Sequence, residues 1–258
     1  IDSQKLSENL RGGQLKSIHI PTESYRELRH LVQLRDTYVQ QSTATKARIK
    51  SLLLSKGIPF PDDTENKWSF AILQKLKEIK CSEPIKFHLN QLIKSLEFFH
   101  DNTLEITRTT RNFCKTDKEI SNNISFVQSI PGIGFITASQ LIARIGDWRQ
   151  LYRFDQIGSF VGLVPTEHST GDNISRGHIT RMGNTDLRGK LIQCAWIAIR
   201  IDPELREFYL RIYERNRNSY GSKKAITAVA RKLTTRIYAV LTQQRCYKMK
   251  SDNELNKR

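Results

Sequence analysis

The sequence lacks the residue patterns of several common kinds of site. Its four cysteines, Cys81, Cys114, Cys194 and Cys246, lie far apart, so no CxxC pair is present to bind zinc or exchange disulfides. The six histidines show no HxxxH spacing, which argues against a metal site on one helix. There is no run of about 18 apolar residues and no apolar signal-type N-terminus. These absences predict a soluble, cytoplasmic chain without a membrane segment.

Positive charge, in contrast, is in excess. The 258 residues include 42 Lys and Arg against 26 Asp and Glu, which gives a formal net charge of +16 and a pI of about 9.8. Residues 203–250 alone hold twelve Lys and Arg and three Glu. Release of counterions from phosphates favours the binding of such a chain to a polyanion. Nucleic acid, and DNA first, is therefore the predicted partner.

Helix-forming composition dominates the chain, and strand signals are weak. We predict a mainly α-helical fold, in which a long coiled-coil helical arm is followed by a compact helical domain that contains a helix-hairpin-helix element. A short helix is expected over residues 2–10. A long helix, capped by Thr22 or Ser24, is expected to end at about Leu54, before Gly57.

The predicted arm depends on an apolar stripe. Apolar residues at steps of three and four mark residues 85–127 and predict one continuous helix with a single packing face. The helix of residues 25–54 offers a facing stripe. The seam between them would include Leu92, Phe99 and Tyr38. Pairing within the chain and pairing between subunits are both compatible with this pattern.

Two glycines one residue apart punctuate the segment SIPGIG, residues 129–134. Glycines allow a tight turn, and the amides that open the next helix could then bind a phosphate without reading base sequence. Gly132, Ile133 and Gly134 are therefore candidate DNA-binding residues of a helix-hairpin-helix element. The alternative is that the two glycines only make a tight turn between two helices.

A second constellation carries hydroxyl groups. The segment FVGLVPTEHSTG is followed by the basic, glycine-rich GHITRMGN and by a helix that is expected to begin near Thr185. A hydroxyl on such a loop can attack a phosphodiester where basic groups neutralise the developing charge. Ser169 is the candidate nucleophile. By spacing alone, a Ser-Thr-Gly sequence is more often a turn than an active site.

Further candidate DNA-binding residues extend from this loop into the basic C-terminal region. They are Arg176, His178, Arg181, Arg188, Lys190, Lys223, Lys224 and Arg231. The alternative is a solvated surface, because charge runs on helices usually face water.

Three segments, PGIGFITASQLIARIGD, GLVPTEHSTGDNISRGHITRMGN and LRGKLIQCAWIAIR, carry a family resemblance. They closely resemble the C-terminal transposase domain of the bacterial insertion-sequence family that includes the pilin-gene-inverting recombinase. The resemblance continues through DPELREFYLRIYERN and KKAITAVARKL. It also extends backward, because IDSQKLSENLRGGQLKSIHIP is similar to the end of that family's RuvC-like DEDD domain.

The resemblance implies a DNA transposase or site-specific recombinase in which a RuvC-like domain that holds Mg²⁺ works with a C-terminal serine. Asp2 matches the last aspartate of the DEDD set and is the implied metal ligand, so the chain is expected to be a fragment whose other acidic residues lie before Ile1. The family serine falls within the pair Ser169-Thr170. Many members have serine immediately before the glycine, where Thr170 stands here, so both hydroxyls are candidates.

The resemblance also implies partners and a division of the chain. Several family members are guided by a bridge RNA, so a guide RNA and a homo-oligomer, dimer or tetramer, are expected in the bacterial cytoplasm at the nucleoid. The alternative function is a non-catalytic helix-hairpin-helix DNA-binding module. The predicted divisions are the end of the RuvC-like domain, the linker and coiled-coil arm, the transposase domain and a polar tail, at residues 1–20, 21–128, 129–250 and 251–258.

Overall fold

The computed structural model of the chain describes residues 2–15, 20–61, 68–150, 153–167, 176–180, 182–217 and 220–249. Within these ranges the fold is mainly α-helical, which confirms the predicted class. The helices are α1 (Asp2–Arg11), α2 (Glu23–Ser55), α3 (Phe70–Glu78), α4 (Glu83–Thr116), α5 (Lys118–Gln128), α6 (Phe135–Ile145), η1 (Trp148–Gln150), α7 (Asp155–Val161), α8 (Thr185–Ile201), α9 (Pro203–Arg215) and α10 (Gly221–Gln243). The strands are β1 (Pro165–Glu167) and β2 (Arg176–Ile179). None of the described helices has the length and apolar character needed to cross a bilayer.

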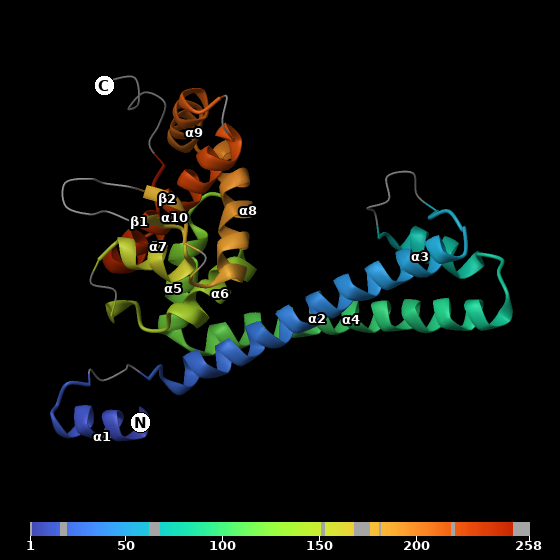
Figure 1. Cartoon of the computed structure of the whole chain (residues 1–258), viewed down its shortest axis with the longest axis horizontal. Coiled ribbons are helices and arrows are strands. Elements are labelled where there is room, and N and C mark those ends of the chain that lie inside the picture. Colours follow the sequence, from blue (N-terminus) through green and yellow to red (C-terminus); the bar gives the residue numbers. More distant parts are fainter. Residues whose placement is uncertain are drawn as a thin grey trace.

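Helices α2, α3 and α4 form an elongated arm. In Figure 1, α2 and α4 lie side by side and run in opposite directions, with α3 at the far end. The two long helices thus pair within the chain, which was one of the two alternatives. Apolar residues of all three helices meet in a tip core, formed by Ile49, Leu53, Ile72, Leu76, Leu89, Ile93 and Leu96.

The arm corrects the prediction of one continuous helix over residues 85–127. Helix α4 ends at Thr116, and Asp117 caps a new helix. The Asp117 carboxylate accepts hydrogen bonds from the amides of Glu119 at 2.9 Å and Ile120 at 3.1 Å. A carboxylate is stabilised at a helix N-terminus and disfavoured in an apolar seam. The break therefore falls at the one charged position of the stripe.

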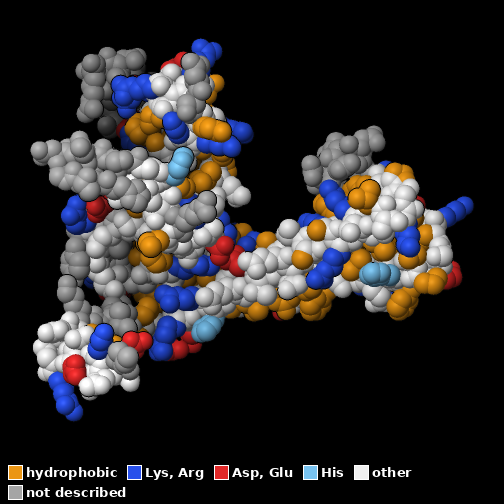
Figure 2. All heavy atoms as spheres, in the orientation of Figure 1, with side chains coloured by type: hydrophobic (Ala, Val, Ile, Leu, Met, Phe, Trp, Pro, Cys, Tyr) orange, Lys and Arg blue, Asp and Glu red, His pale blue; other side chains and the backbone are white. Residues whose placement is uncertain are grey.

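The predicted seam residues lie between the two arm helices with different burial. The ring of Tyr38 meets that of Phe99 edge-on, with centroids 5.9 Å apart. Leu92 is half-buried beside the tip core, whereas its neighbour Ile93 is fully buried. Phe87 on the same helix is exposed, and Figure 2 shows hydrophobic side chains on the surface of this distal region.

Helices α5 to α10 and the β hairpin form a compact body, in which α10 is the most central element. Eleven residues of α10 are buried, from Gly221 to Leu241. The arm is rooted in this body, since Tyr25, Leu28 and Val32 of α2 belong to the body core. Damage to α10 would consequently reach most elements of the body, whereas the tip core is remote from it (Figure 1).

A buried ion pair joins the last two helices. Arg236 Nη1 lies 2.6 Å from Asp202 Oδ2, with only 8% and 3% of the side chains exposed. The Tyr247 hydroxyl donates to the same oxygen at 3.1 Å, and its ring lies under the guanidinium. Burial raises the pKa of Tyr247 above its usual range. The Tyr247 amide donates to Ser129 Oγ at 2.7 Å, which ties the C-terminal segment to the turn after α5.

Candidate nucleic-acid interface

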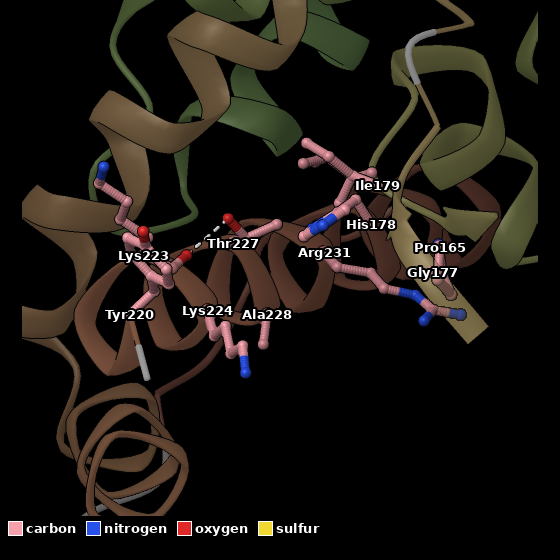
Figure 3. A pocket seen from close by; sticks show the side chains of 11 residues that line it. Pro165, Gly177, His178, Ile179, Tyr220, Lys223, Lys224, Thr227, Ala228 and Arg231 are labelled. Carbon is pink, nitrogen blue, oxygen red and sulfur yellow. Dashed lines mark hydrogen bonds between the residues drawn. The ribbon is translucent and has the colours of Figure 1, made fainter. Parts of the chain in front are cut away.

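One face of α10 and the β hairpin enclose a pocket of about 750 Å³. Figure 3 shows its lining residues along α10 and on β2. Of the predicted DNA-binding residues, His178, Lys223, Lys224 and Arg231 meet here. Lys224 and Arg231, seven residues apart, lie on the same side of α10, and the Lys223 side chain points away from that of Lys224 (Figure 3). The remaining lining residues are Leu163, Pro165, Gly177, Ile179, Tyr220, Thr227 and Ala228.

The hairpin that forms one wall was not predicted, because strands of three and four residues are too short to show alternation. The two strands are antiparallel. Thr166 Oγ1 donates to the carbonyl of His178 at 3.1 Å and so fixes β2 against β1. Gly177 makes room for that hydroxyl, since a Cβ at this position would collide with it. The hairpin therefore presents His178 from a defined position.

Arg188 lies at the base of the hairpin. Its Nη1 donates to the carbonyl of Val161 at 3.2 Å, so the guanidinium joins the end of α7 to α8. Gly162 has a φ of +71°, and a Cβ there would collide with the carbonyl of Met182. This close approach explains the glycine, because the left-handed region and the lack of space both exclude larger residues. The structure gives Arg188 a role in positioning the hairpin.

The pocket is positively charged. No carboxylate among the described residues forms an ion pair with Lys223, Lys224 or Arg231. In contrast, Lys232 on the same helix forms an ion pair with Glu204 of α9 at 2.6 Å and does not line the pocket. These three cations can donate hydrogen bonds to phosphate oxygens, and such contacts fix position without reading bases.

The two candidate nucleophiles lie outside the described residues. In the sequence, Ser169 and Thr170 belong to the connection between β1 and β2, the two strands beside the pocket. Arg181 is also outside the described residues, and of Arg176 only the backbone is described. The structure therefore describes the two ends of this connection, Glu167 of β1 and Arg176 of β2.

The turn between α5 and α6 gives its two glycines different roles. Gly132 has a φ of +87° and abuts α8, where a Cβ would collide with the carbonyl of Cys194 and lie 2.9 Å from the amide of Ala198. Ile133 is buried in the body core. Gly134 is exposed, and no side chain caps α6 there. The free amides at the start of α6 could therefore bind a phosphate at this turn, which does not line the pocket.

Lys190 joins α8 to the arm. Its Nζ lies 2.9 Å from Asp36 Oδ1, and Gln140 Nε2 donates to the same oxygen at 2.7 Å. Arg144 bridges Asp36 at 3.6 Å and Asp186 at 3.7 Å. Since only 13% of the Asp36 side chain is exposed, these donors compensate a largely desolvated carboxylate. The network connects α2, α6 and α8 where the arm leaves the body.

Asp2, the implied metal ligand, is exposed on α1. The described part of the chain contains no group of three or more His, Cys, Asp or Glu that could hold a metal ion. Mg²⁺ prefers six oxygen ligands in octahedral geometry, and a single carboxylate supplies only one or two of them. The described residues therefore do not fit a complete magnesium site.

Tyr220 is a lining residue that the sequence analysis missed. It stands at the N-cap of α10 with 77% of its surface exposed. An aromatic residue directly before a glycine and two lysines was the available signal, since aromatic and basic residues together are typical of nucleic-acid surfaces.

Comparison with known proteins identifies the region that spans the turn, the hairpin and α8. Residues 124–210 match the model of the transposase family IS116/IS110/IS902. Residues 124–210 are thus similar to that transposase family. The resemblance noted in the sequence is confirmed at this level.

Similarity to IS116/IS110/IS902-type transposases extends along the chain. The chain is 27% identical over 252 residues to the transposase for insertion sequence element IS1111A of Coxiella burnetii, which covers 96% of the chain and 67% of that protein. It is 24% identical over 270 residues to the putative transposase y4qE of Sinorhizobium fredii, with 95% and 64% covered. The pilin gene-inverting protein of Moraxella bovis is 26% identical over 175 residues, with 67% and 53% covered. The chain thus spans about two thirds of the length of the first two relatives.

Proposed function

We propose that this chain is the DNA-binding and strand-transfer part of a transposase or site-specific recombinase, with Ser169 or Thr170 as the nucleophile. One observation supports the proposal. The connection that carries both hydroxyls joins the two strands beside a pocket with three cations that have no carboxylate partner among the described residues. Attack on a phosphodiester requires positive groups near the developing charge, and the pocket supplies them.

The proposed reaction conserves the phosphodiester bond energy. The serine or threonine oxygen attacks phosphorus, the bond from phosphorus to the 3′ oxygen breaks, and the 3′ oxygen leaves with a proton. The product is a 5′-phosphate ester of the protein, which a second 3′ hydroxyl can attack to rejoin DNA. His178 is the described pocket residue whose ring can accept the proton of the nucleophile.

Other parts of the proposal rest on the resemblance alone. They are a RuvC-like domain with Mg²⁺, a guide RNA and a homo-oligomer. No step is assigned to Mg²⁺, because the described residues do not form its site.

The test of the nucleophile uses the full-length protein with its partner RNA and a suicide DNA substrate. Ser169→Ala should abolish the covalent protein–DNA adduct, while Thr170→Ala and the control Ser159→Ala, an exposed hydroxyl on α7, should retain it. The reverse pattern would assign the nucleophile to Thr170. If the unaltered protein formed no adduct, the chain would be a DNA-binding module without this chemistry.

The role of the pocket cations is tested by the salt dependence of duplex binding. Each phosphate contact contributes about 0.9 to the log–log slope, so Lys223→Gln, Lys224→Gln and Arg231→Gln should each reduce the slope by about this amount. Lys232→Gln is the matched control, because Lys232 is engaged by Glu204. If the slopes of all four variants equalled that of the unaltered chain, these cations would make no phosphate contact and would only face solvent.

A further inference from the structure

Tyr220 combines a strained backbone with an exposed ring. Its φ is +53°, in the left-handed region that bulky residues rarely adopt. Only one other non-glycine residue of the described chain, Gln244, has a positive φ. Such strain persists when surrounding structure enforces it, and it tends to occur at functional sites. The next residue, Gly221, is also closely packed, since a Cβ there would lie 2.8 Å from the carbonyl of Asn216.

The Tyr220 ring contributes little to the fold. It is 77% exposed, and the described residues offer its hydroxyl no hydrogen bond. Its one aromatic interaction among them is with Lys223 Nζ, 5.6 Å from the ring centroid. A smaller residue such as asparagine would suit this backbone better. The ring is thus available for a partner outside the chain.

The pocket beside Tyr220 has two kinds of surface. Leu163, Pro165, Ile179 and Ala228 supply apolar walls. Lys224 and Arg231 of α10 supply positive charge to the same pocket (Figure 3). The distance along the helix axis from Tyr220 to Arg231 is about 16 Å. This distance exceeds the spacing of neighbouring nucleotides in one strand, so a segment of several nucleotides could lie along it.

We infer that this pocket binds an unpaired segment of DNA, with one base stacked on Tyr220 and its phosphates held by Lys224 and Arg231. A duplex presents its phosphates to a protein but keeps the faces of its bases stacked inside the helix. An aromatic ring beside apolar walls can be used only by a base that has left the stack. The inference rests on the proposed function, since it names the form of DNA that the same site receives.

The test is equilibrium binding of the full chain to a short fluorescent oligothymidylate, to a duplex, and to an abasic strand of equal length. Tyr220→Asn removes the ring and suits the left-handed backbone. It should weaken oligothymidylate binding by about 5- to 150-fold, the range for loss of one stacked base. It should leave duplex binding unchanged and raise the thermal unfolding midpoint. Tyr220→Phe should bind as the unaltered chain does.

The controls separate stacking from fold and from charge. Gln244→Asn changes the other left-handed non-glycine residue of the described chain, at the C-cap of α10, and should leave oligothymidylate binding unchanged. On the abasic strand, Tyr220→Asn and the unaltered chain should bind equally. Equal loss on all three DNA ligands, or no loss on any, would overturn the inference. So would a loss confined to a matching RNA oligonucleotide.

The nucleophile and the stacking site can fail independently. The covalent adduct depends on Ser169 or Thr170, and stacking is measured without any reaction. An adduct with no effect of Tyr220→Asn would reject only the stacking site, whereas stacking without an adduct would reject only the nucleophile.

Discussion

The arm and the body use the same kind of helix but different kinds of contact. In the arm, α2 and α4 share one long seam, and the ion pair Lys77–Glu97 between α3 and α4 is about a third exposed. In the body, α10 touches several elements at once and the Asp202–Arg236 pair is buried. A substitution in a single seam destabilises only the helices of that seam. A substitution in a central helix destabilises every element that packs against it. The distal arm around the tip core can therefore vary with little effect on the pocket.

The largest expected effect comes from breaking the buried ion pair. Asp202→Ala leaves Arg236 without its carboxylate and should destabilise the body by about 3–5 kcal/mol. Glu97→Ala, which breaks the exposed pair of the arm, should lose less than about 1 kcal/mol. Urea unfolding of both variants checks the difference. Comparable losses would contradict the proposed contrast between body and arm.

The tip core can be broken without the body. Ile93→Ala removes a fully buried side chain and should destabilise the arm by about 2–5 kcal/mol, through lost burial and the cavity left behind. Hydrogen exchange should accelerate in α3 and the distal half of α4, with α10 unchanged. The control is Phe87→Ala, whose side chain is 67% exposed. Faster exchange throughout α10 would show that the two cores are coupled.

Two glycines with positive φ sharpen the comparison. Gly132→Ala in the body forces a Cβ into the backbone of α8 and should lose about 2–4 kcal/mol, from overpacking and left-handed strain together. Gly57→Ala in the arm meets open space and should lose only about 1 kcal/mol. Thermal unfolding of the two variants gives the comparison. If Gly57→Ala were the more damaging, the packing of Gly132 against α8 would not be the cause.

The smallest effect concerns alkaline pH at the junction of arm and body. Burial raises the pKa of Tyr25 to about 12 from an ordinary value near 10. The folded state therefore favours the neutral phenol, so its stabilising contribution is complete below pH 10 and is lost as pH rises toward about 12. Tyr25→Phe should remove about 2–3 kcal/mol of this alkaline loss, measured by urea unfolding at pH 9 to 12. An identical dependence of the unfolding free energy on pH in both proteins would show that Tyr25 does not cause the alkaline loss of stability.

The strongest sequence signals were local. Periodicity together with Gly57 predicted the end of α2 within one residue, and the predicted start of α8 at Thr185 is confirmed. Thr22 is the N-cap of α2, as proposed, although its side chain makes no capping bond. These features depend on residues within a few positions of each other, so a single sequence contains the relevant information.

The failures came where two interpretations of one residue compete. Asp117 stood in an apolar stripe, and periodicity alone did not show that its carboxylate would cap α5. The sequence also does not distinguish Arg231, which lines the pocket, from the adjacent Lys232, which pairs with Glu204. The choice depends on α9, whose packing no local pattern reveals.

The sequence by itself determined the helical class, the positive charge and the family motifs, because composition and helix periodicity are local properties. Tertiary structure decided which cations are unpaired, which glycines meet a neighbouring backbone, and that Tyr220 and His178 share one pocket. His178 and Tyr220 are separated in the sequence by α8 and α9, and they line one pocket because the hairpin lies beside α10. Such proximity arises from burial of apolar faces that are distant in sequence, and those contacts leave no spacing along the chain.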